Sequence, residues 1–285
     1  MPTPQSPESY KYLPPSPDAS RSPCPALNAL ANHGYIPRDG KDISFLTMLC
    51  AVKHVYNLSY PLALLLTAVG YITSGHISFT PYTPYASQTK TKYIPPTLST
   101  LISLLILILT FFPLPLPTWT LSLSSLSTRG HTKIAHDASL VHPDTVPSSA
   151  PDPALLASFL HKSKSKSKSK SEAHRGDGLT LADLGALHAQ REAERGMPLS
   201  RLHEQVALGE CGLAWCVMRV PSCAGGGTGD EGEDVIPLST LEQWFGEERL
   251  PEGWWDEVGG GRPGRRVGLL EAGWRARVVG GYARG

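Results

Sequence analysis

The sequence lacks a marked excess of charge of either sign. Its 26 basic and 25 acidic side chains leave a formal net charge of +1 over 285 residues. Proteins that bind nucleic acid or anionic surfaces use a basic field or a dense basic patch. Near-neutrality therefore argues against nucleic acid as a partner.

Cysteine is scarce, and an apolar leader is missing. The five cysteines are an odd number without the spacing of a disulfide framework, so we expect reduced thiols. Residues 1–22 are polar and proline-rich, with no apolar stretch that a signal peptide would use. We therefore expect an intracellular protein, most simply a cytoplasmic one, in which 1–22 is an extended arm.

The chain also lacks a run of alternating β-branched residues, so no sheet is expected. Apolar residues at helical spacing recur instead, and proline opens and glycine closes the pattern over 25–33. Further helices are predicted over 44–56, 61–72, 154–161, 199–218 and 238–247, and another follows the capping-box pattern of Thr180 and Asp183. The predicted fold class is mainly α, with one helical domain over 23–255.

Two segments interrupt this domain. The alternating Lys/Ser run has no apolar residue to bury, so 162–175 is predicted to be a flexible linker. Residues 93–128 carry no charge, and prolines bound a 16-residue apolar core at 97–112. At about 1.5 Å per residue this core reaches roughly 24 Å, short of a hydrocarbon layer of about 30 Å. Membrane contact through 97–117, a buried helix, an insertion over 76–118 and a sequence artefact stay open as interpretations.

The C-terminal residues, 256–285, are rich in glycine and arginine and are predicted to be a tail outside the domain. Trp254, Trp255 and Trp274 flank or belong to this region. We expect them to be packing anchors, because large aromatic side chains bury much apolar area.

Cys24 lies between two prolines at the start of the helix predicted over 25–33. If Cys24 is the N-cap, the free N–H groups of Ala26 and Leu27 and the positive end of the helix dipole lie beside its sulfur. Both favour the thiolate, which is a nucleophile or a soft metal ligand. Helix-start geometry alone leaves a buried, inert cysteine as the alternative.

The run SPCPALNALANHGYIPRDG, residues 22–40, closely resembles the proximal signature of the fungal haem-thiolate peroxidases, the chloroperoxidase and unspecific peroxygenase family. Two later segments resemble that family in the same order: KIAHDASL at 133–140 and FGEERLPEGW at 245–254. The resemblance covers roughly 20–75 and 119–255. The short-chain, intracellular type is the nearer match.

The resemblance implies that haem b is the cofactor and that Cys24 is the axial ligand of its iron. A thiolate ligand pushes electron density onto iron and favours O–O cleavage. The resemblance also implies that Glu210 is the distal acid–base group, hydrogen-bonded by His136. Hydrogen peroxide would then oxygenate or halogenate a small organic substrate. The alternative is a haem-binding, catalytically impaired and membrane-associated protein on the same scaffold.

Helical geometry supports Glu210 independently of the resemblance. Small or apolar side chains share its face of the helix predicted over 199–218: Val206, Ala207, Leu213, Ala214 and Val217. A carboxylate on such a face would be desolvated, and its pKa would rise towards the range useful for proton transfer. An ordinary surface glutamate is the alternative.

The chain departs from the family pattern at Ala135, where the family carries a glutamate that binds Mg or Mn. The resemblance assigns Ser139 and the carbonyl of His136 as the remaining protein ligands. Without the carboxylate a hard cation loses its only charged protein ligand, so we expect weak Mg or Mn binding. A zinc site at Cys211, Cys216 and Cys223 is not expected, since the first two lie about 140° apart on a helical wheel.

Overall fold

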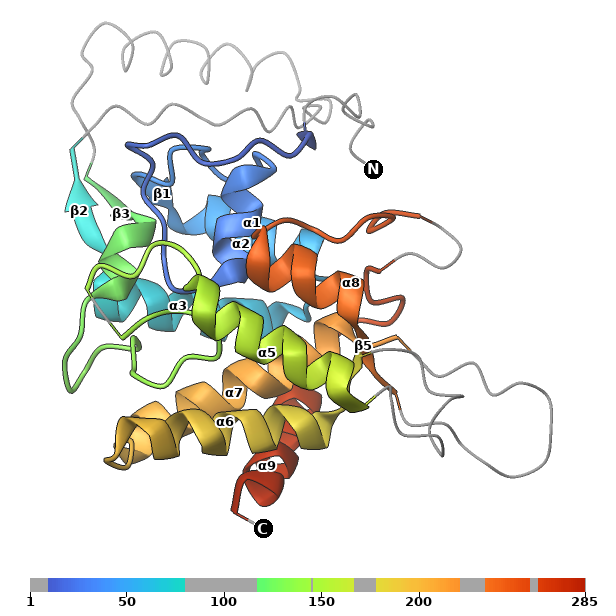
Figure 1. Cartoon of the computed structure of the whole chain (residues 1–285). Helices are drawn as coiled ribbons and strands as arrows, with labels where there is room; N and C mark the ends of the chain where they lie inside the picture. The colour runs from blue at the N-terminus through green and yellow to red at the C-terminus, as the bar shows by residue number, and fades with distance from the viewer. Residues whose placement is uncertain are drawn as a thin grey trace, which may run out of the picture.

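The computed structural model describes residues 10–79, 117–144, 146–166, 178–220, 234–256 and 261–284. They form a mainly α domain, which confirms the predicted fold class (Figure 1). The segment 97–117 lies outside the described residues except for residue 117. Cys223 and most of the linker predicted over 162–175 also lie outside them. Within the described ranges, no helix is both long and apolar enough to cross a bilayer.

Three helices form the N-terminal part of the domain: α1 (Pro25–Asn32), α2 (Phe45–Val55) and α3 (Tyr60–Ser74). Each begins where the sequence predicts, within a residue. Proline opens α1 at its first position, and the Ser44 hydroxyl accepts a hydrogen bond from the Thr47 N–H to cap α2. Glycine at 34 takes a φ of +76°, which turns the chain away after α1.

A small antiparallel sheet joins these helices, although none was expected from the sequence. Its order is β1 (Ile43–Ser44), β3 (Thr118–Leu121), β2 (His76–Ser78), and the 3-10 helix η2 (Leu123–Ser127) follows. The strands have only two to four residues, too few to show an alternating pattern. Because His76 pairs with Thr120, both ends of the predicted 76–118 insertion belong to the domain's own sheet.

The C-terminal half is built from long helices. They are α5 (Pro153–Lys166), α6 (Leu181–Arg195) and α7 (Arg201–Met218). The capping box predicted at Thr180 and Asp183 opens α6. A two-stranded ladder, β4 (Gly178–Leu179) with β5 (Ile236–Pro237), leads to α8 (Leu238–Leu241) and the π-helical turn η3 (Glu242–Gly246). Helix α5 continues to Lys166, so the linker predicted over 162–175 is helical at its beginning.

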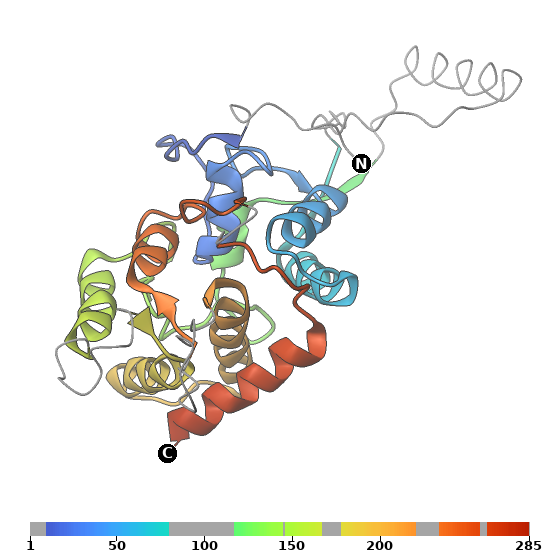
Figure 2. The ribbon, with the colours of Figure 1, turned by 90° about the vertical axis from the view of Figure 1, so that its right-hand side faces the viewer.

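The prediction that 256–285 is a tail outside the domain is wrong, because most of this segment folds as α9 (Leu269–Arg284). Helix α9 packs against α6 and α7, at the end of the molecule opposite the β1–β3–β2 sheet (Figures 1 and 2). Glycine makes this contact possible: a Cβ at Gly212 would lie 2.7 Å from the backbone nitrogen of Ala276. The apolar residues of α9 are spread around the helix rather than gathered in one stripe, so its docking depends on this close approach.

The N-terminal arm and the tryptophans also differ in part from expectation. Arg21 is buried, and its guanidinium donates to the side-chain oxygen of Asn32 at 2.7 Å, so the end of the arm is part of the core. Trp254 is buried as predicted, whereas Trp255 and Trp274 are 44% and 56% exposed. The last two are therefore surface aromatics rather than anchors.

Candidate active site

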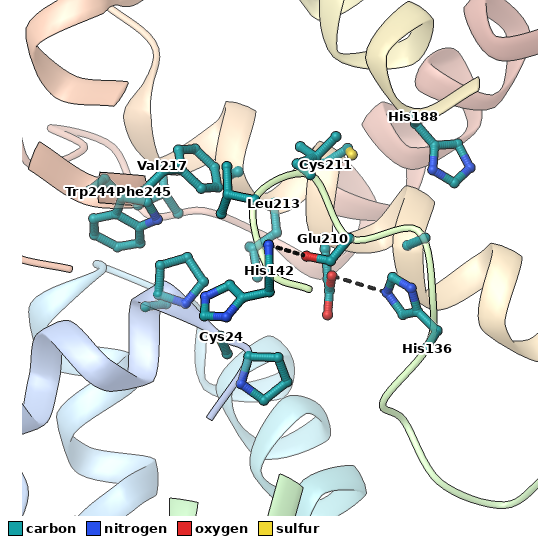
Figure 3. A pocket seen from close by; sticks show the side chains of 18 of the residues that line it. Cys24, His136, His142, His188, Glu210, Cys211, Leu213, Val217, Trp244 and Phe245 are labelled. Atoms are coloured by element: carbon teal, nitrogen blue, oxygen red, sulfur yellow. Dashed lines mark hydrogen bonds and ion pairs between the residues drawn. The ribbon is translucent and has the colours of Figure 1, made fainter. Parts of the chain in front are cut away.

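One cavity brings together the three residues that the sequence singles out. It lies between the N-terminal end of α1, the 136–142 segment and α7, and Cys24, His136 and Glu210 all line it (Figure 3). About 880 Å³ of it is free of protein atoms, part of which is open to solvent. Chain segments more than a hundred residues apart thus meet around a single space.

The remaining wall is largely apolar. Helix α7 contributes Ala207, Leu213, Ala214 and Val217 to it. These side chains are spaced along the same face as Glu210, as the helical pattern predicts. Phe245 adds an aromatic ring from η3. The cavity is a mostly hydrophobic site with a few polar groups, which is typical of a site for an organic ligand or cofactor.

Cys24 is the N-cap of α1, as predicted, but its thiol is not pre-ionised. Burial raises the pKa of Cys24 to about 12, and the negative charge of Glu210 adds to the rise, while the N–H groups of Leu27 and Ala26 oppose it. Desolvation of the sulfur thus outweighs the helix terminus. A bound metal ion would reverse this balance, because a coordinated thiol loses its proton.

Glu210 projects from the middle of α7 into the cavity. Its side chain is 61% exposed, so the predicted desolvation of the carboxylate is wrong for the protein by itself. The helical wheel correctly places small side chains beside Glu210, but those side chains are too small to cover it. Glu210 therefore faces the space in which a ligand would bind.

His136 is the partner of Glu210. Its Nε2 lies 3.2 Å from Oε2 of Glu210, and its Nδ1 lies 2.7 Å from the carbonyl oxygen of Asp137. Burial lowers the pKa of His136, but the charge and hydrogen bond of Glu210, together with the Asp137 carbonyl, outweigh burial and raise it overall. A carbonyl only accepts, so Nδ1 carries a proton and Nε2 shares one proton with Glu210.

The segment that the resemblance connects with Mg or Mn is held by arginines. Arg129 and Arg195 both bind the carboxylate of Asp137, at 2.6 and 3.0 Å, and Arg191 Nε donates to the carbonyl of Ser139 at 2.9 Å. Ser139 lines the cavity, and Ala135 is buried. Over the described ranges, no group of three or more His, Cys, Asp or Glu side chains could hold a metal ion.

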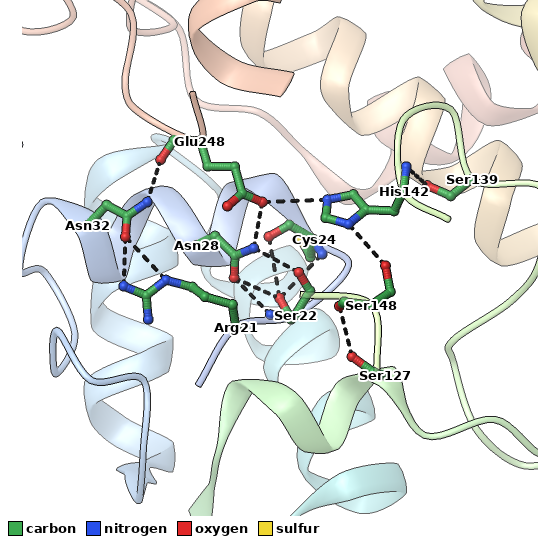
Figure 4. A network of polar contacts seen from close by, with 10 residues as sticks. All are labelled: Arg21, Ser22, Cys24, Asn28, Asn32, Ser127, Ser139, His142, Ser148 and Glu248. Atoms are coloured by element: carbon green, nitrogen blue, oxygen red, sulfur yellow. Dashed lines mark hydrogen bonds and ion pairs between the residues drawn. The ribbon is translucent and has the colours of Figure 1, made fainter. Parts of the chain in front are cut away.

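Sequence reasoning missed a buried polar network beside Cys24 (Figure 4). Asn28 Nδ2 donates to Oε1 of Glu248 at 2.6 Å, and the Asn28 side-chain oxygen accepts from the Ser22 N–H at 2.9 Å. His142 Nε2 lies 3.5 Å from the same Glu248 oxygen. Glu248 belongs to the segment at 245–254 that resembles the family, but nothing in its local pattern shows that it is buried.

Two further cavity residues carry titratable or aromatic groups that the sequence did not single out. His188 lies on the buried face of α6, and burial lowers its pKa, which favours the neutral imidazole. Tyr56 lies at the end of α2, and its hydroxyl donates to the carbonyl of Ala26 at 2.6 Å. This bond ties α2 to the first turn of α1, directly after Cys24.

Comparison with known proteins agrees with this arrangement. The model of the family described as "Peroxidase, family 2" matches residues 10–258. The chain belongs to this family. A peroxidase family implies a haem cofactor, and the match includes every residue that lines the cavity.

Individual relatives match shorter segments. The chloroperoxidase of Leptoxyphium fumago is 73% identical over 33 residues, which are 12% of this chain and 9% of that protein. The aromatic peroxidase fscJ of Fusarium equiseti is 39% identical over 69 residues, 24% and 16% of the two chains. The aromatic peroxygenase of Coprinellus radians is 36% identical over 68 residues, 24% and 26%. The matched segments thus span about a tenth to a quarter of these relatives.

The residues of this family member fit a haem. The half-buried thiol of Cys24 stands at one wall of an apolar cavity, and the Glu210–His136 pair stands in the same cavity. A soft sulfur donor suits iron better than it suits a hard cation. The fit is poorer for Mg or Mn, because the segment from Ala135 to Ser139 provides no free carboxylate and Asp137 is already bound by two arginines.

Proposed function

We propose that this protein is a haem-thiolate peroxidase or peroxygenase that uses hydrogen peroxide to oxidise a small organic substrate. One observation carries the proposal: Cys24 and the Glu210–His136 pair line one apolar cavity. Bound haem b would supply an iron centre that gives electrons to peroxide and then takes electrons from the organic substrate. The chain's own residues would hold the haem iron and move the peroxide proton.

Cys24 would hold the iron through its sulfur. The thiol must lose its proton when it binds, and its raised pKa means that only a strong metal–sulfur bond can compensate. The N–H groups of Ala26 and Leu27 then face the bound thiolate, so they stabilise its negative charge.

Glu210 and His136 would move the peroxide proton. Since Nδ1 of His136 donates to the Asp137 carbonyl, the shared proton between Nε2 and Oε2 holds the carboxylate in one orientation. The other oxygen of Glu210 is then available to take a proton from one peroxide oxygen and return it to the departing oxygen. Protonated His136 compensates the carboxylate's charge before the first transfer and after the second.

A second candidate function is haem binding with little catalysis. Ala135 favours it, because the carboxylate that the family uses for its cation is missing. The arginines at 129, 191 and 195 argue against it, since they hold the 136–139 segment without a metal ion. Peroxide turnover by the haem-loaded protein distinguishes the two candidates.

The ligand assignment is tested by the spectrum of the haem-loaded protein. The ferrous carbon-monoxide complex should show the red-shifted Soret band of thiolate ligation, and Cys24→Ser should abolish that band. Cys50→Ser is the matched control, because Cys50 is an exposed free thiol on α2. An unchanged spectrum in Cys24→Ser rules out the proposed ligand.

The acid–base assignment is tested by Glu210→Gln. This variant should keep the thiolate spectrum but lose on the order of a hundredfold or more in peroxide turnover. Glu204→Gln is the control on the same helix, since Glu204 pairs at 3.3 Å with Arg284 and does not line the cavity. Full turnover in Glu210→Gln would remove this residue from the mechanism.

A further inference from the structure

A series of aromatic rings leads from the cavity towards the protein surface. Tyr56 and Trp244 line the cavity, and their ring centroids are 5.2 Å apart. The buried ring of Trp254 lies 6.1 Å from Tyr56 and 6.2 Å from Trp244. These three rings form a triangle of close contacts directly behind the cavity wall.

The series continues to a surface aromatic cluster around Trp255. Trp255 follows Trp254 in the chain, with Cα atoms about 3.8 Å apart, and its side chain is 44% exposed. Its ring stacks on His54 at 5.3 Å and lies 6.1 Å from Tyr35, which in turn stacks on Tyr10 at 4.2 Å. The peptide bond between Trp254 and Trp255 thus joins the three rings at the cavity to an exposed indole.

The polar surroundings of Trp255 suit an oxidation site. Arg262 lies over the indole at 5.2 Å, and its guanidinium donates to the carbonyl of His54 at 3.0 Å. A fixed positive charge opposes removal of an electron from the ring, so Trp255, once oxidised, is a strong oxidant. Burial raises the pKa of Tyr35 to about 12, so its hydroxyl stays protonated beside Trp255.

We propose that Trp255 is a second oxidation site, for phenolic donors that are attached to bulky molecules and do not enter the cavity. The inference rests on the proposed function, because hydrogen peroxide supplies the oxidising equivalents at the buried site. Trp254, Trp244 and Tyr56 provide the route for electrons between the two sites. Trp255 touches the donor and is therefore a catalytic residue of the surface reaction.

The reaction balances as two one-electron steps. In each step one electron leaves Trp255 for the oxidised buried site, and a phenol at the surface restores it. The phenol loses one electron and its hydroxyl proton and becomes a phenoxyl radical. Two phenols and one hydrogen peroxide give two phenoxyl radicals and two waters, the protons from the phenols ending in the waters.

The test uses one phenol in two forms with the haem-loaded protein. Free N-acetyltyramine is a small phenol of the kind that the cavity is proposed to admit, whereas tyramine coupled by an amide to dextran presents the same ring on a polymer. Trp255→Phe should slow peroxide-dependent coupling of the dextran conjugate by at least about tenfold and change the rate with N-acetyltyramine by less than about twofold. Trp254→Phe should have the same effect, because it interrupts the route behind the surface.

Trp274→Phe is the matched control. Trp274 is also exposed and also lies under a guanidinium, that of Arg275 at 4.5 Å, but it lies on α9 and is not part of the ring series. It should behave like the unchanged protein with both donors. This control distinguishes the effect of removing any exposed tryptophan from the effect of removing the one next to Trp254.

A readout independent of turnover uses peroxide without a donor. Freeze-quenched samples should show a tryptophan-radical signal by electron paramagnetic resonance, and peptide mapping should find oxidised Trp255. Trp255→Phe should lose both, and Trp274→Phe should keep both. Equal signals and equal dextran rates in Trp255→Phe would overturn the surface site and leave the proposed function standing. Failure of the unchanged protein to oxidise N-acetyltyramine would overturn both.

Discussion

Replacing Glu248 by alanine should destabilise the protein by breaking the network beside Cys24 (Figure 4). Glu248 is 5% exposed, and its carboxylate accepts from Asn28 Nδ2 at 2.6 Å and lies 3.5 Å from Nε2 of His142. A buried hydrogen bond to a charged group contributes about 1.5 to 3 kcal/mol. Removing one partner of a buried pair also leaves the other partner without compensation.

We expect the free energy of unfolding to fall by about 3 kcal/mol in Glu248→Ala. For a domain of this size that loss lowers the melting temperature by roughly 6 to 12 °C. Glu248→Gln retains an oxygen that can accept from Asn28, so it should lose only about 1 kcal/mol. Thermal and urea unfolding of the cofactor-free proteins, followed by circular dichroism, measure both values.

Glu252→Ala provides the control from the same segment. Its side chain is 81% exposed and pairs with Arg249 at 2.9 Å, so its removal should cost at most about 1 kcal/mol. If Glu248→Ala and Glu252→Ala unfold at the same temperature, the buried network does not stabilise the start of α1. The argument from burial would then be refuted for this site.

Three further predictions follow from the site and from α9. In Glu210→Gln the pKa of His136 should fall, because burial persists while the carboxylate charge is lost, and histidine NMR titration measures this pKa. In the unchanged protein, the stabilisation by protonated His136 is complete below about pH 6.5. It disappears as the pH rises through the raised pKa of His136. In cofactor-free protein at pH 8, Cys24 should react with iodoacetamide at least about a hundredfold more slowly than in urea-unfolded protein, and equal rates would contradict its burial. Gly212→Ala should destabilise by about 1 to 3 kcal/mol, whereas Gly209→Ala, where a Cβ meets nothing within 4 Å, should not, as paired urea titrations would show.

Local patterns in the sequence were enough to locate the main helices. The proline and glycine around 25–33, the serine before α2 and the Thr180–Asp183 pair each act within one turn of helix. Cys24 could therefore be placed at a helix start without any long-range information. The short strands could not be placed, since a strand of two residues has no periodicity of its own.

The family resemblance selected Cys24, His136 and Glu210, but the sequence could not tell how exposed each of them would be. The helical wheel described the neighbours of Glu210 on α7 and missed that this face borders a cavity. For Cys24 it identified the helix terminus and missed the depth of burial, which dominates the pKa of the thiol. Exposure depends on segments that lie far away in the chain.

The sequence by itself determined where helices begin, which cysteine stands at a helix start and which carboxylate shares a helix face with small side chains. Only the tertiary structure decided that α9 docks on α7, that Glu248 is buried next to Asn28, and that the ring of Trp254 packs against Tyr56 of the cavity wall. The physical reason is the range of the interactions. Capping and helical periodicity act over a few residues, whereas burial and ring contacts arise when distant segments pack together.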